Sequence, residues 1–323
     1  MVPEVGGGTL APRMRALVVT NMYPTPARPA LGSFVRDQVE ALRRIEGVQV
    51  ELFAFSPGGA AAYVKAAQAL LRRHRATRYD VVHAHFGLSA WPAFAARGAA
   101  YAVTLHGTDL VHPRSRAITL AALPMLDLVA TVSEPLATQV PGWAVRGRQA
   151  VLPCGVDLER FRPIPRAEAR AALNLAPTGR YLLFPADPTR PEKRHDRALA
   201  LAAETKAELI SLGNVDPAAV PLYVNAANAV LVPSERESFG LAVLEALACN
   251  VPVLATPVGI APTALKDLPG TLCTEFDPAT WRAALEPHLT DADPRIANGR
   301  ARAESYGTDR MAVQVLAAWR SLT

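Results

Sequence analysis

The chain has 323 residues, half of them hydrophobic and a fifth charged, which is typical of a globular protein long enough for two domains. No apolar run approaches the roughly 20 residues that a membrane-spanning helix needs. The formal net charge of +5 is unevenly distributed, because residues 14–153 contain 15 basic and 8 acidic residues and residues 154–323 contain 18 and 20. The N-terminal half, at +7, could therefore face nucleic acid, an anionic membrane or a phosphorylated substrate, or its charge could reflect an Arg-rich genome.

Two further features concern the compartment. The three cysteines, Cys154, Cys249 and Cys273, are odd in number, widely spaced and without a CxxC pair. A disulfide framework or zinc site is therefore not expected, and a reducing cytoplasm fits better. Residues 1–13 have no apolar signal core, and we expect them to form a disordered extension.

The first half of the chain alternates short β-branched runs with Ala-rich helical stretches. Strands are predicted at 15–20, 48–55, 80–86, 101–106 and 127–133, and an amphipathic helix at 32–44 has apolar residues at Phe34, Val35, Val39 and Leu42. Most of these strands are continuous apolar runs, which indicates burial on both faces of a parallel sheet.

The same pattern then repeats. Strands are predicted at 181–186, 207–213, 228–234 and 251–257, with helices near 193–203, 217–226 and 240–249. We therefore predict an α/β fold of two Rossmann-like, doubly wound domains facing each other across a cleft. The predicted N-terminal, acceptor-side domain spans 14–155 and the C-terminal, donor-binding domain 156–307. A final helix in 308–323 should pack back toward the N-terminal domain.

The stretch "SERESFGLAVLEAL" at 234–247 follows one of these buried strands and opens a helix. Backbone amides at Phe239, Gly240 and Leu241, next to Ser238, would form a helix N-terminus suited to a phosphate. Glu237 lies before this site, and Glu245 lies beyond it at roughly 10 Å, as the rise per residue predicts. Two carboxylates so placed could accept hydrogen bonds from the hydroxyl groups of two sugars joined by a diphosphate.

This segment, "ERESFGLAVLEALACNVPVLATPVG", resembles the E-x7-E signature of retaining family 4 glycosyltransferases, which have the GT-B fold. Other pieces align in the same order, including "DVVHAHFG", "VTLHGTDL", "VLPCGVDLERFRP" and "RPEKRHDRA". The resemblance extends from Met14 to about Ala261.

The resemblance implies roles for residues elsewhere in the chain. An Arg and a Lys of the family neutralise the donor diphosphate, and Lys193 matches the lysine. The family's Gly-Arg is here Ala186-Asp187, which leaves Arg190 as the candidate arginine. His106 matches the family histidine that reaches the donor sugar.

Two regions of the N-terminal half add weaker matches. Gly32 matches a family glycine that allows close approach to the donor, and Thr108 and Asp109 are candidates for acceptor contact. His83 and His85 point to the same face of one strand and could share a metal ion, but no third ligand is evident. Like the family in general, the chain is expected to need no metal or other cofactor.

The resemblance implies transfer of a hexosyl group from a UDP-, GDP- or ADP-sugar to a hydroxyl acceptor with retention of configuration. The alternatives are a GT-B epimerase, and a non-catalytic subunit that binds a nucleotide-sugar or a partner, which the altered Ala186-Asp187 loop favours. Nucleic-acid binding is not expected, since stacking aromatics do not alternate with the basic residues. The basic helix at 61–77 can lie on an anionic bilayer at the inner face of the plasma membrane, or it can simply pack on its own sheet.

Overall fold

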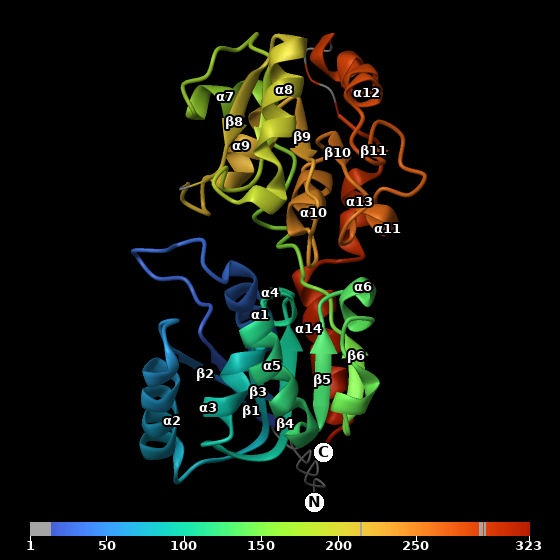
Figure 1. The fold of residues 1–323 in the computed structure, drawn as a ribbon. Helices are drawn as coiled ribbons and strands as arrows, with labels where there is room; N and C mark the ends of the chain where they lie inside the picture. The colour runs from blue at the N-terminus through green and yellow to red at the C-terminus, as the bar shows by residue number, and fades with distance from the viewer. Residues whose placement is uncertain (1–13, 214, 291–292, 294) are drawn as a thin grey trace, which may run out of the picture.

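The protein is described by a computed structural model covering residues 14–213, 215–290, 293 and 295–323. The predicted extension at 1–13 lies outside these residues. The described chain forms two parallel sheets, each with helices on both faces, stacked as two lobes (Figure 1). The predicted pair of Rossmann-like domains is therefore confirmed.

The N-terminal sheet has the strand order β2-β1-β3-β4-β5-β6 in the described part of the chain. Its strands are β1 (Met14–Thr20), β2 (Val48–Ala54), β3 (Arg78–His85), β4 (Arg97–Leu105), β5 (Leu128–Thr131) and β6 (Arg148–Val151). The helices of this half are α1 (Ser33–Arg43), α2 (Ala60–His74), α3 (Ala90–Ala93), α4 (Thr108–Val111), α5 (Pro113–Ala122) and α6 (Glu134–Ala137).

The C-terminal sheet has the order β11-β10-β9-β7-β8. Its strands are β7 (Tyr181–Phe184), β8 (Glu208–Ser211), β9 (Ala229–Val232), β10 (Val253–Ala255) and β11 (Leu272–Cys273). The remaining helices are α7 (Arg166–Ala172), α8 (His195–Thr205), α9 (Val220–Ala226), α10 (Leu241–Ala248), α11 (Ala261–Ala264), α12 (Pro278–Thr290), α13 (Gly299–Glu304) and α14 (Thr308–Arg320).

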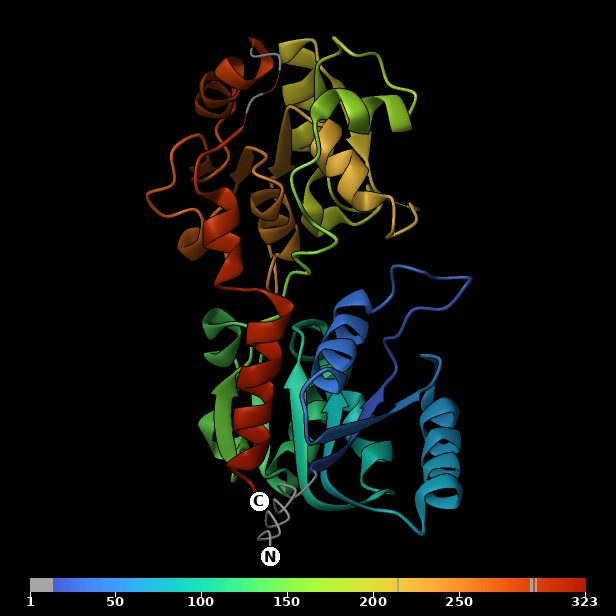
Figure 2. The same cartoon turned by 180° about the vertical axis from the view of Figure 1, so that it is seen from behind.

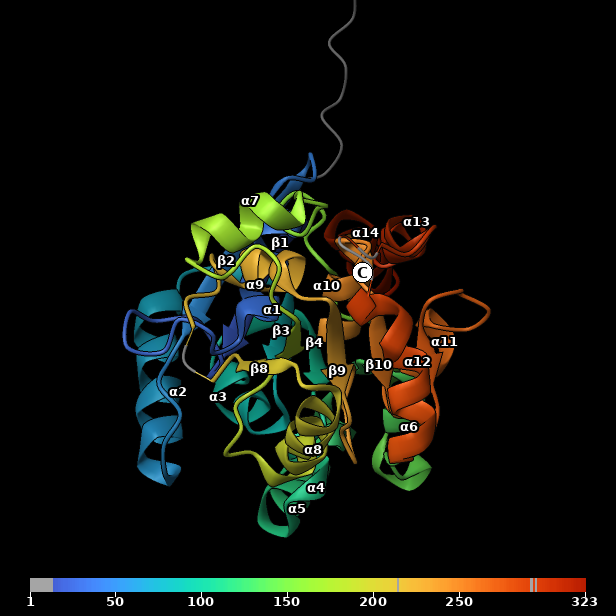
Figure 3. The ribbon, with the colours of Figure 1, turned by 90° about the horizontal axis from the view of Figure 1, so that it is seen from above.

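Alternate residues of β1 face opposite sides of the N-terminal sheet, and both sides are buried. Ala16 and Val18 belong to the core that contains α1 and α14, whereas Leu17 and Val19 belong to the core beneath α2 and α3. This two-sided burial explains the continuous apolar run in the sequence. In the C-terminal domain α8 and α12 lie on one side of the sheet, and α9 and α10 lie on the other (Figure 3).

Two strands were not predicted, and both lie at sheet edges. β6 begins with the exposed pair Arg148 and Gln149, and β11 has only two residues. Short edge strands with polar residues lack the apolar run by which buried strands are recognised. Neither strand contributes to the cavity described below.

The chain crosses between the lobes twice, and the two crossings pair with each other. Val156 N–H donates to Tyr306 O at 2.9 Å, and Thr308 N–H donates to Val156 O at 3.0 Å. After the second crossing α14 runs along the N-terminal lobe beside α1 (Figure 2). Boundaries at 155/156 and 307/308 stay a prediction with which this path agrees.

Candidate active site

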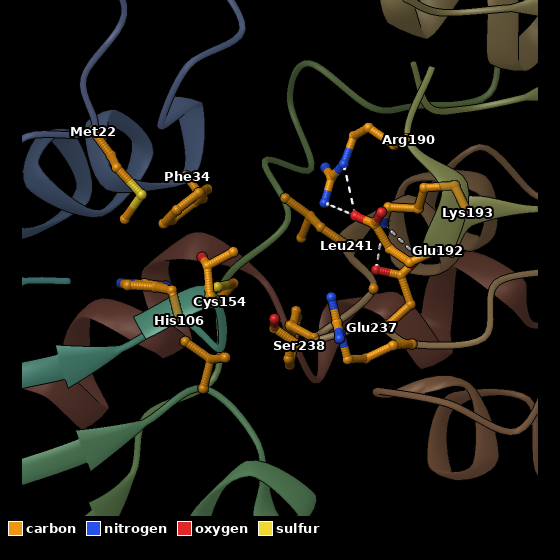
Figure 4. Close-up of a pocket in the computed structure, with 15 residues that line it drawn as sticks. Met22, Phe34, His106, Cys154, Arg190, Glu192, Lys193, Glu237, Ser238 and Leu241 are labelled. Atoms are coloured by element: carbon orange, nitrogen blue, oxygen red, sulfur yellow. Dashed lines mark hydrogen bonds and ion pairs between the residues drawn. The ribbon is translucent and has the colours of Figure 1, made fainter. Parts of the chain in front are cut away.

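A cavity of about 260 Å³ lies between the lobes, where the strands of both sheets end (Figure 4). Its N-terminal wall comes from the loops after β1 and β4 and from the start of α1. Its C-terminal wall comes from the loops after β7 and β9 and from the start of α10. The cavity brings together nine residues predicted from the sequence, namely His106, Thr108, Arg190, Lys193, Glu237, Ser238, Phe239, Gly240 and Leu241.

The loop before α10 forms the C-terminal wall around one carboxylate. Gly240, at φ 87°, precedes the first helical residue, Leu241, so the helix begins at the cavity as predicted. Lys193 Nζ donates to both carboxylate oxygens of Glu237, at 2.7 and 2.6 Å, and Ser234 Oγ donates to Oε1 at 2.8 Å. The side chains of Lys193 and Glu237 are only 14% and 11% exposed. A cation and a carboxylate are therefore held at a helix N-terminus in partial shelter from water.

Arg190 provides the second cation of this wall. Its guanidinium donates to Glu192 Oε1 at 2.9 and 2.6 Å, and its side chain is 53% exposed. Both cations are thus paired with carboxylates that an incoming anion could displace. Asp187, in the position of the family's arginine, instead closes a turn by accepting from Thr189 N at 2.9 Å and Thr189 Oγ1 at 2.7 Å.

Glu245 lies in an adjoining cavity of about 350 Å³ that is also lined by Arg190, Lys193 and Glu237. Burial raises the pKa of Glu245 to about 7, which the charge of Arg160 opposes and the carboxylate of Asp37 reinforces. Arg160 is engaged elsewhere, because its Nη2 donates to Asp37 Oδ2 at 2.6 Å. The two cavities together can accommodate a ligand longer than a single sugar.

In the N-terminal wall, the loop after β4 is held in place by Asp109. The carboxylate of Asp109 is fully buried and accepts the backbone N–H groups of Gly87 at 3.1 Å, His106 at 3.1 Å and Gly107 at 2.8 Å. The expectation that Asp109 contacts an acceptor is therefore corrected: its carboxylate stabilises the loop and lines neither cavity. Thr108, in contrast, is exposed and lines the main cavity.

The two walls touch at the bottom of the cavity. Ser133 Oγ donates to Ser238 O at 2.7 Å across the lobes. Gly107, at φ 99°, is so close to the same serine that a Cβ would lie 2.1 Å from Ser238 Oγ. A larger residue at Gly107 would require the Ser238 side chain to move, and the positive φ would strain it, so glycine permits this close contact between the lobes.

Gly32 has a structural reason to be glycine that differs from the predicted one. It precedes α1 at φ 67°, and a Cβ there would lie 2.2 Å from the carbonyl oxygen of Met22. Gly32 lines neither cavity; its neighbours Met22 and Phe34 line the main one. The close approach seen at Gly32 is to the protein's own backbone, and its predicted approach to the donor stays a prediction.

Phe34 is a site residue that was not predicted from the sequence. Its ring lies 4.8 Å from that of His106, centroid to centroid, and lines the cavity. The helical spacing predicts that Phe34 belongs to the buried face of α1, and it gives no signal that separates a core position from a pocket position. Met22, Cys154 and Arg236 line the cavity too and have no sequence signal of their own.

His83 and His85 do face the same way, and they extend toward His106. The His85 ring lies 4.9 Å from that of His83 and 5.3 Å from that of His106. His85 Nδ1 and His106 Nε2 are 3.0 Å apart, which is a hydrogen bond and leaves no room for an ion between them. Within the described residues, no group of three or more His, Cys, Asp or Glu side chains could hold a metal.

Comparison with known families assigns both halves of the chain. Residues 187–309 match the model described as "Glycosyl transferases group 1", and residues 31–160 match "Glycosyltransferase Family 4". D-inositol 3-phosphate glycosyltransferase from Actinosynnema mirum is 32% identical over 81% of this chain and 77% of its own. The protein of the same name from Streptomyces coelicolor is 30% identical over 74% and 68%.

Solved structures share the architecture. Sucrose-phosphate synthase from Thermosynechococcus elongatus superposes with a TM-score of 0.74 at 21% identity, over 96% of this chain and 99% of its own. HepE from Anabaena, in complex with UDP and glucose, gives 0.72 at 17%, over 95% and 100%. At these identities the likeness shows the fold, which is GT-B.

Proposed function

Because this chain belongs to glycosyltransferase family 4, we propose that it transfers a hexosyl group from a nucleoside-diphosphate sugar to a hydroxyl acceptor with retention of configuration. The observation that carries this proposal is the Lys193–Glu237 pair at the N-terminus of α10, facing His106 across the cleft. A site with these three components has an anion-binding cation, an acceptor for sugar hydroxyls and a polar group on the opposite wall.

The proposed donor position follows from the charges. The diphosphate would lie against the amides at the start of α10 and against Lys193 and Arg190, whose present partners are carboxylates. The ribose would lie in the adjoining cavity with Glu245. Glu237, released from Lys193 by the incoming diphosphate, would then accept hydrogen bonds from the transferred sugar.

The proposed reaction breaks the bond between the anomeric carbon and the diphosphate oxygen. The acceptor oxygen forms its new bond on the same face, and its proton passes to the departing phosphate. Lys193 and Arg190 stabilise the charge that develops on the leaving group, which is where electrostatic catalysis has most effect. No side chain is required as a covalent nucleophile.

A thermal-shift screen of UDP-, GDP- and ADP-hexoses tests the donor site. We expect the hexoses of one nucleotide to raise the melting temperature of the wild type and to change the melting temperatures of K193A and E245A little. The matched control is K266A, which removes an exposed lysine of the same domain. If no nucleotide-sugar at millimolar concentration shifts the wild type, the proposed donor site is wrong.

The acceptor is a hydroxyl compound such as a lipid-linked sugar, a glycan or a small molecule. The curated relatives act, by their names, on D-inositol 3-phosphate, so phosphorylated inositol is the first acceptor to test. An assay of nucleoside-diphosphate release with and without phosphorylated inositol decides whether this protein uses the acceptor that its relatives' names give. The exposed hydroxyl of Thr108 is the acceptor-side contact that we propose.

A second candidate function is a non-catalytic subunit that binds a nucleotide-sugar or a partner. The observation that favours it is Asp187, which stands where the family has an arginine and is close enough to Arg190 to interact with its charge. Hydrogen bonds from Thr189 lower the pKa of the Asp187 carboxyl. A charge of the wrong sign there would weaken stabilisation of the leaving group. Binding of a donor without release of the nucleoside diphosphate would support this alternative.

We also propose peripheral contact with an anionic membrane through α2, on the cytoplasmic face. The exposed side of α2 combines Val64 and Leu71, which are 55% and 57% exposed, with Lys65, Arg72 and Arg73. None of the described helices is both long and apolar enough to cross a bilayer. Flotation with phosphatidylglycerol vesicles should recover the wild type, and recovery should fall in a K65E/R72E double variant; equal recovery contradicts the proposal.

A further inference from the structure

Three histidines and a tryptophan form a continuous column of rings from α14 to the candidate active site. Trp319 packs edge-on against His83 at 5.7 Å, His83 stacks on His85 at 4.9 Å, and His85 stacks on His106 at 5.3 Å. Phe34 closes the column on the cavity side at 4.8 Å from His106. His83 and His85 are fully buried. The catalytic proposal above uses only His106 and leaves the rest of the column without a role.

The hydrogen bonds of His83 fix where its proton lies. The indole nitrogen of Trp319 can only donate, and it donates to His83 Nδ1 at 2.9 Å. A neutral His83 therefore carries its proton on Nε2, which donates to Thr104 Oγ1 at 2.8 Å. Burial keeps the pKa of His83 well below the usual range, so a neutral ring of fixed tautomer stacks on His85.

The same reasoning applies to His85 through a different partner. The amide nitrogen of Gln38 lies 3.1 Å from His85 Nε2 and donates to it. The proton of His85 therefore lies on Nδ1, and Nδ1 donates to His106 Nε2 at 3.0 Å. Since His106 Nε2 accepts, a neutral His106 must carry its own proton on Nδ1. Burial lowers the pKa of His85 to about 4, and that of His106 well below its usual value, which agrees with two neutral rings.

We propose that Gln38 and His85 are positioning residues that hold His106 as its neutral Nδ1–H tautomer, so that His106 presents a hydrogen-bond donor, and not a base or a cation, to a hydroxyl in the cleft. The chemical meaning of this inference rests on the proposed function, whereas its primary test does not. Gln38 lies on α1, 47 residues before His85, and His106 lies on the following strand's loop. The hydrogen-bond donor that His106 presents is therefore set by two residues, Gln38 and His85, that do not themselves line the main cavity.

The test is ¹⁵N NMR of the histidine rings in the unliganded full chain, which reports the tautomer of each ring directly. Assignment by single substitutions, including H106N, separates His106 from the other six histidines. We expect a protonated Nδ1 on His106 in the wild type. In Q38E the carboxylate can only accept, so His85 must carry a proton on Nε2. Where the His85 signals show a neutral ring, its Nδ1 then accepts, and we expect the proton of His106 to move to Nε2. Q68E makes the same chemical change at an exposed glutamine on α2 and should leave the His106 signals unchanged.

A second pair of variants covers the case in which Q38E does not fold. Asn at position 85 can place an amide N–H near the former Nδ1, whereas Leu cannot, so His106 should keep its tautomer in H85N and become a mixture in H85L. Once a donor and acceptor are known, kcat should fall about ten- to hundredfold in H85L and stay nearer the wild type in H85N, the range expected for one buried hydrogen bond.

Two results would overturn the inference. One is a wild-type His106 that is protonated on Nε2 or is cationic at pH 7. The other is a His106 tautomer that is the same in the wild type and in Q38E with a neutral His85. Neither result depends on whether the protein is a glycosyltransferase. Failure of the donor screen, conversely, would leave the tautomer assignment intact.

Discussion

Replacement of Glu245 by glutamine should stabilise the unliganded protein, and the gain should depend on pH. The carboxyl group of Glu245 is partly buried, and burial raises its pKa to about 7, from 4.5 in the unfolded chain. Between these values the folded protein binds the proton and the unfolded chain does not. Stability therefore falls as pH rises through this window and stays low above it.

The magnitude follows from the size of the shift. A shift from 4.5 to about 7 corresponds to about 3 kcal/mol of lost stability once the pH is above both values, at roughly 1.4 kcal/mol per pKa unit. E245Q does not carry the charge and should escape the loss. At pH 5 the two proteins should differ by less than about 1 kcal/mol, and at pH 8 E245Q should be the more stable by about 3 kcal/mol.

Urea unfolding at pH 5, 6, 7 and 8, followed by tryptophan fluorescence and by circular dichroism, measures this difference. E204Q removes an exposed glutamate on α8 of the same domain and serves as the matched control. Parallel stability profiles for wild type and E245Q would refute the reasoning, because they would mean that the carboxyl titrates alike in the folded and unfolded chains. A difference confined to E245Q supports a pocket that holds this carboxyl out of water.

Three further results are expected from the contacts at the cleft. E237Q releases Lys193 from its ion pair, so we expect its affinity for the nucleoside diphosphate of the stabilising donor, measured by calorimetry, to rise about three- to tenfold while transfer falls. An unchanged affinity would contradict displacement of Glu237 by the diphosphate. K193A should weaken binding of the same nucleoside diphosphate by about ten- to hundredfold, the size of a lost charged hydrogen bond, and binding equal to that of K266A would exclude the proposed phosphate site. G32A should cost about 2 kcal/mol of unfolding free energy, since its Cβ would lie 2.2 Å from the carbonyl oxygen of Met22; a melting temperature within 1 °C or so of the wild type would show that the loop adjusts freely.

The sequence predicts the fold well because its signals are local. Buried parallel strands such as 228–234 are apolar runs, and the glycine before α10 lies at the start of a periodic helix, so the strand, loop and helix of the E-x7-E segment can be recognised within about 20 residues. The period of two along a strand also predicts that His83 and His85 share a face. These features depend on neighbours in the chain.

The contacts that organise the site depend on residues far apart in the chain. Glu237 was expected to contact a sugar, and its pairing with Lys193 joins positions 44 residues apart. Trp319 reaches His83 across 236 residues. In the sequence, Asp109 of "HGTD" is a candidate for ligand contact. Only its burial and its three backbone hydrogen bonds show that its carboxylate stabilises the loop. Nothing in local periodicity predicts such pairings.

Turnover is the decisive test of hexosyl transfer from a nucleoside-diphosphate sugar in this cleft. Release of the nucleoside diphosphate would be measured with the donor that stabilises the wild type, in the presence of phosphorylated inositol and of a pool of glycan and lipid-linked acceptors. The account predicts acceptor-dependent release by the wild type and by K266A, near-background release by K193A, and a product whose anomeric carbon keeps the donor's configuration. Donor binding with release no greater than that of K193A would contradict the account and identify the protein as a binding subunit.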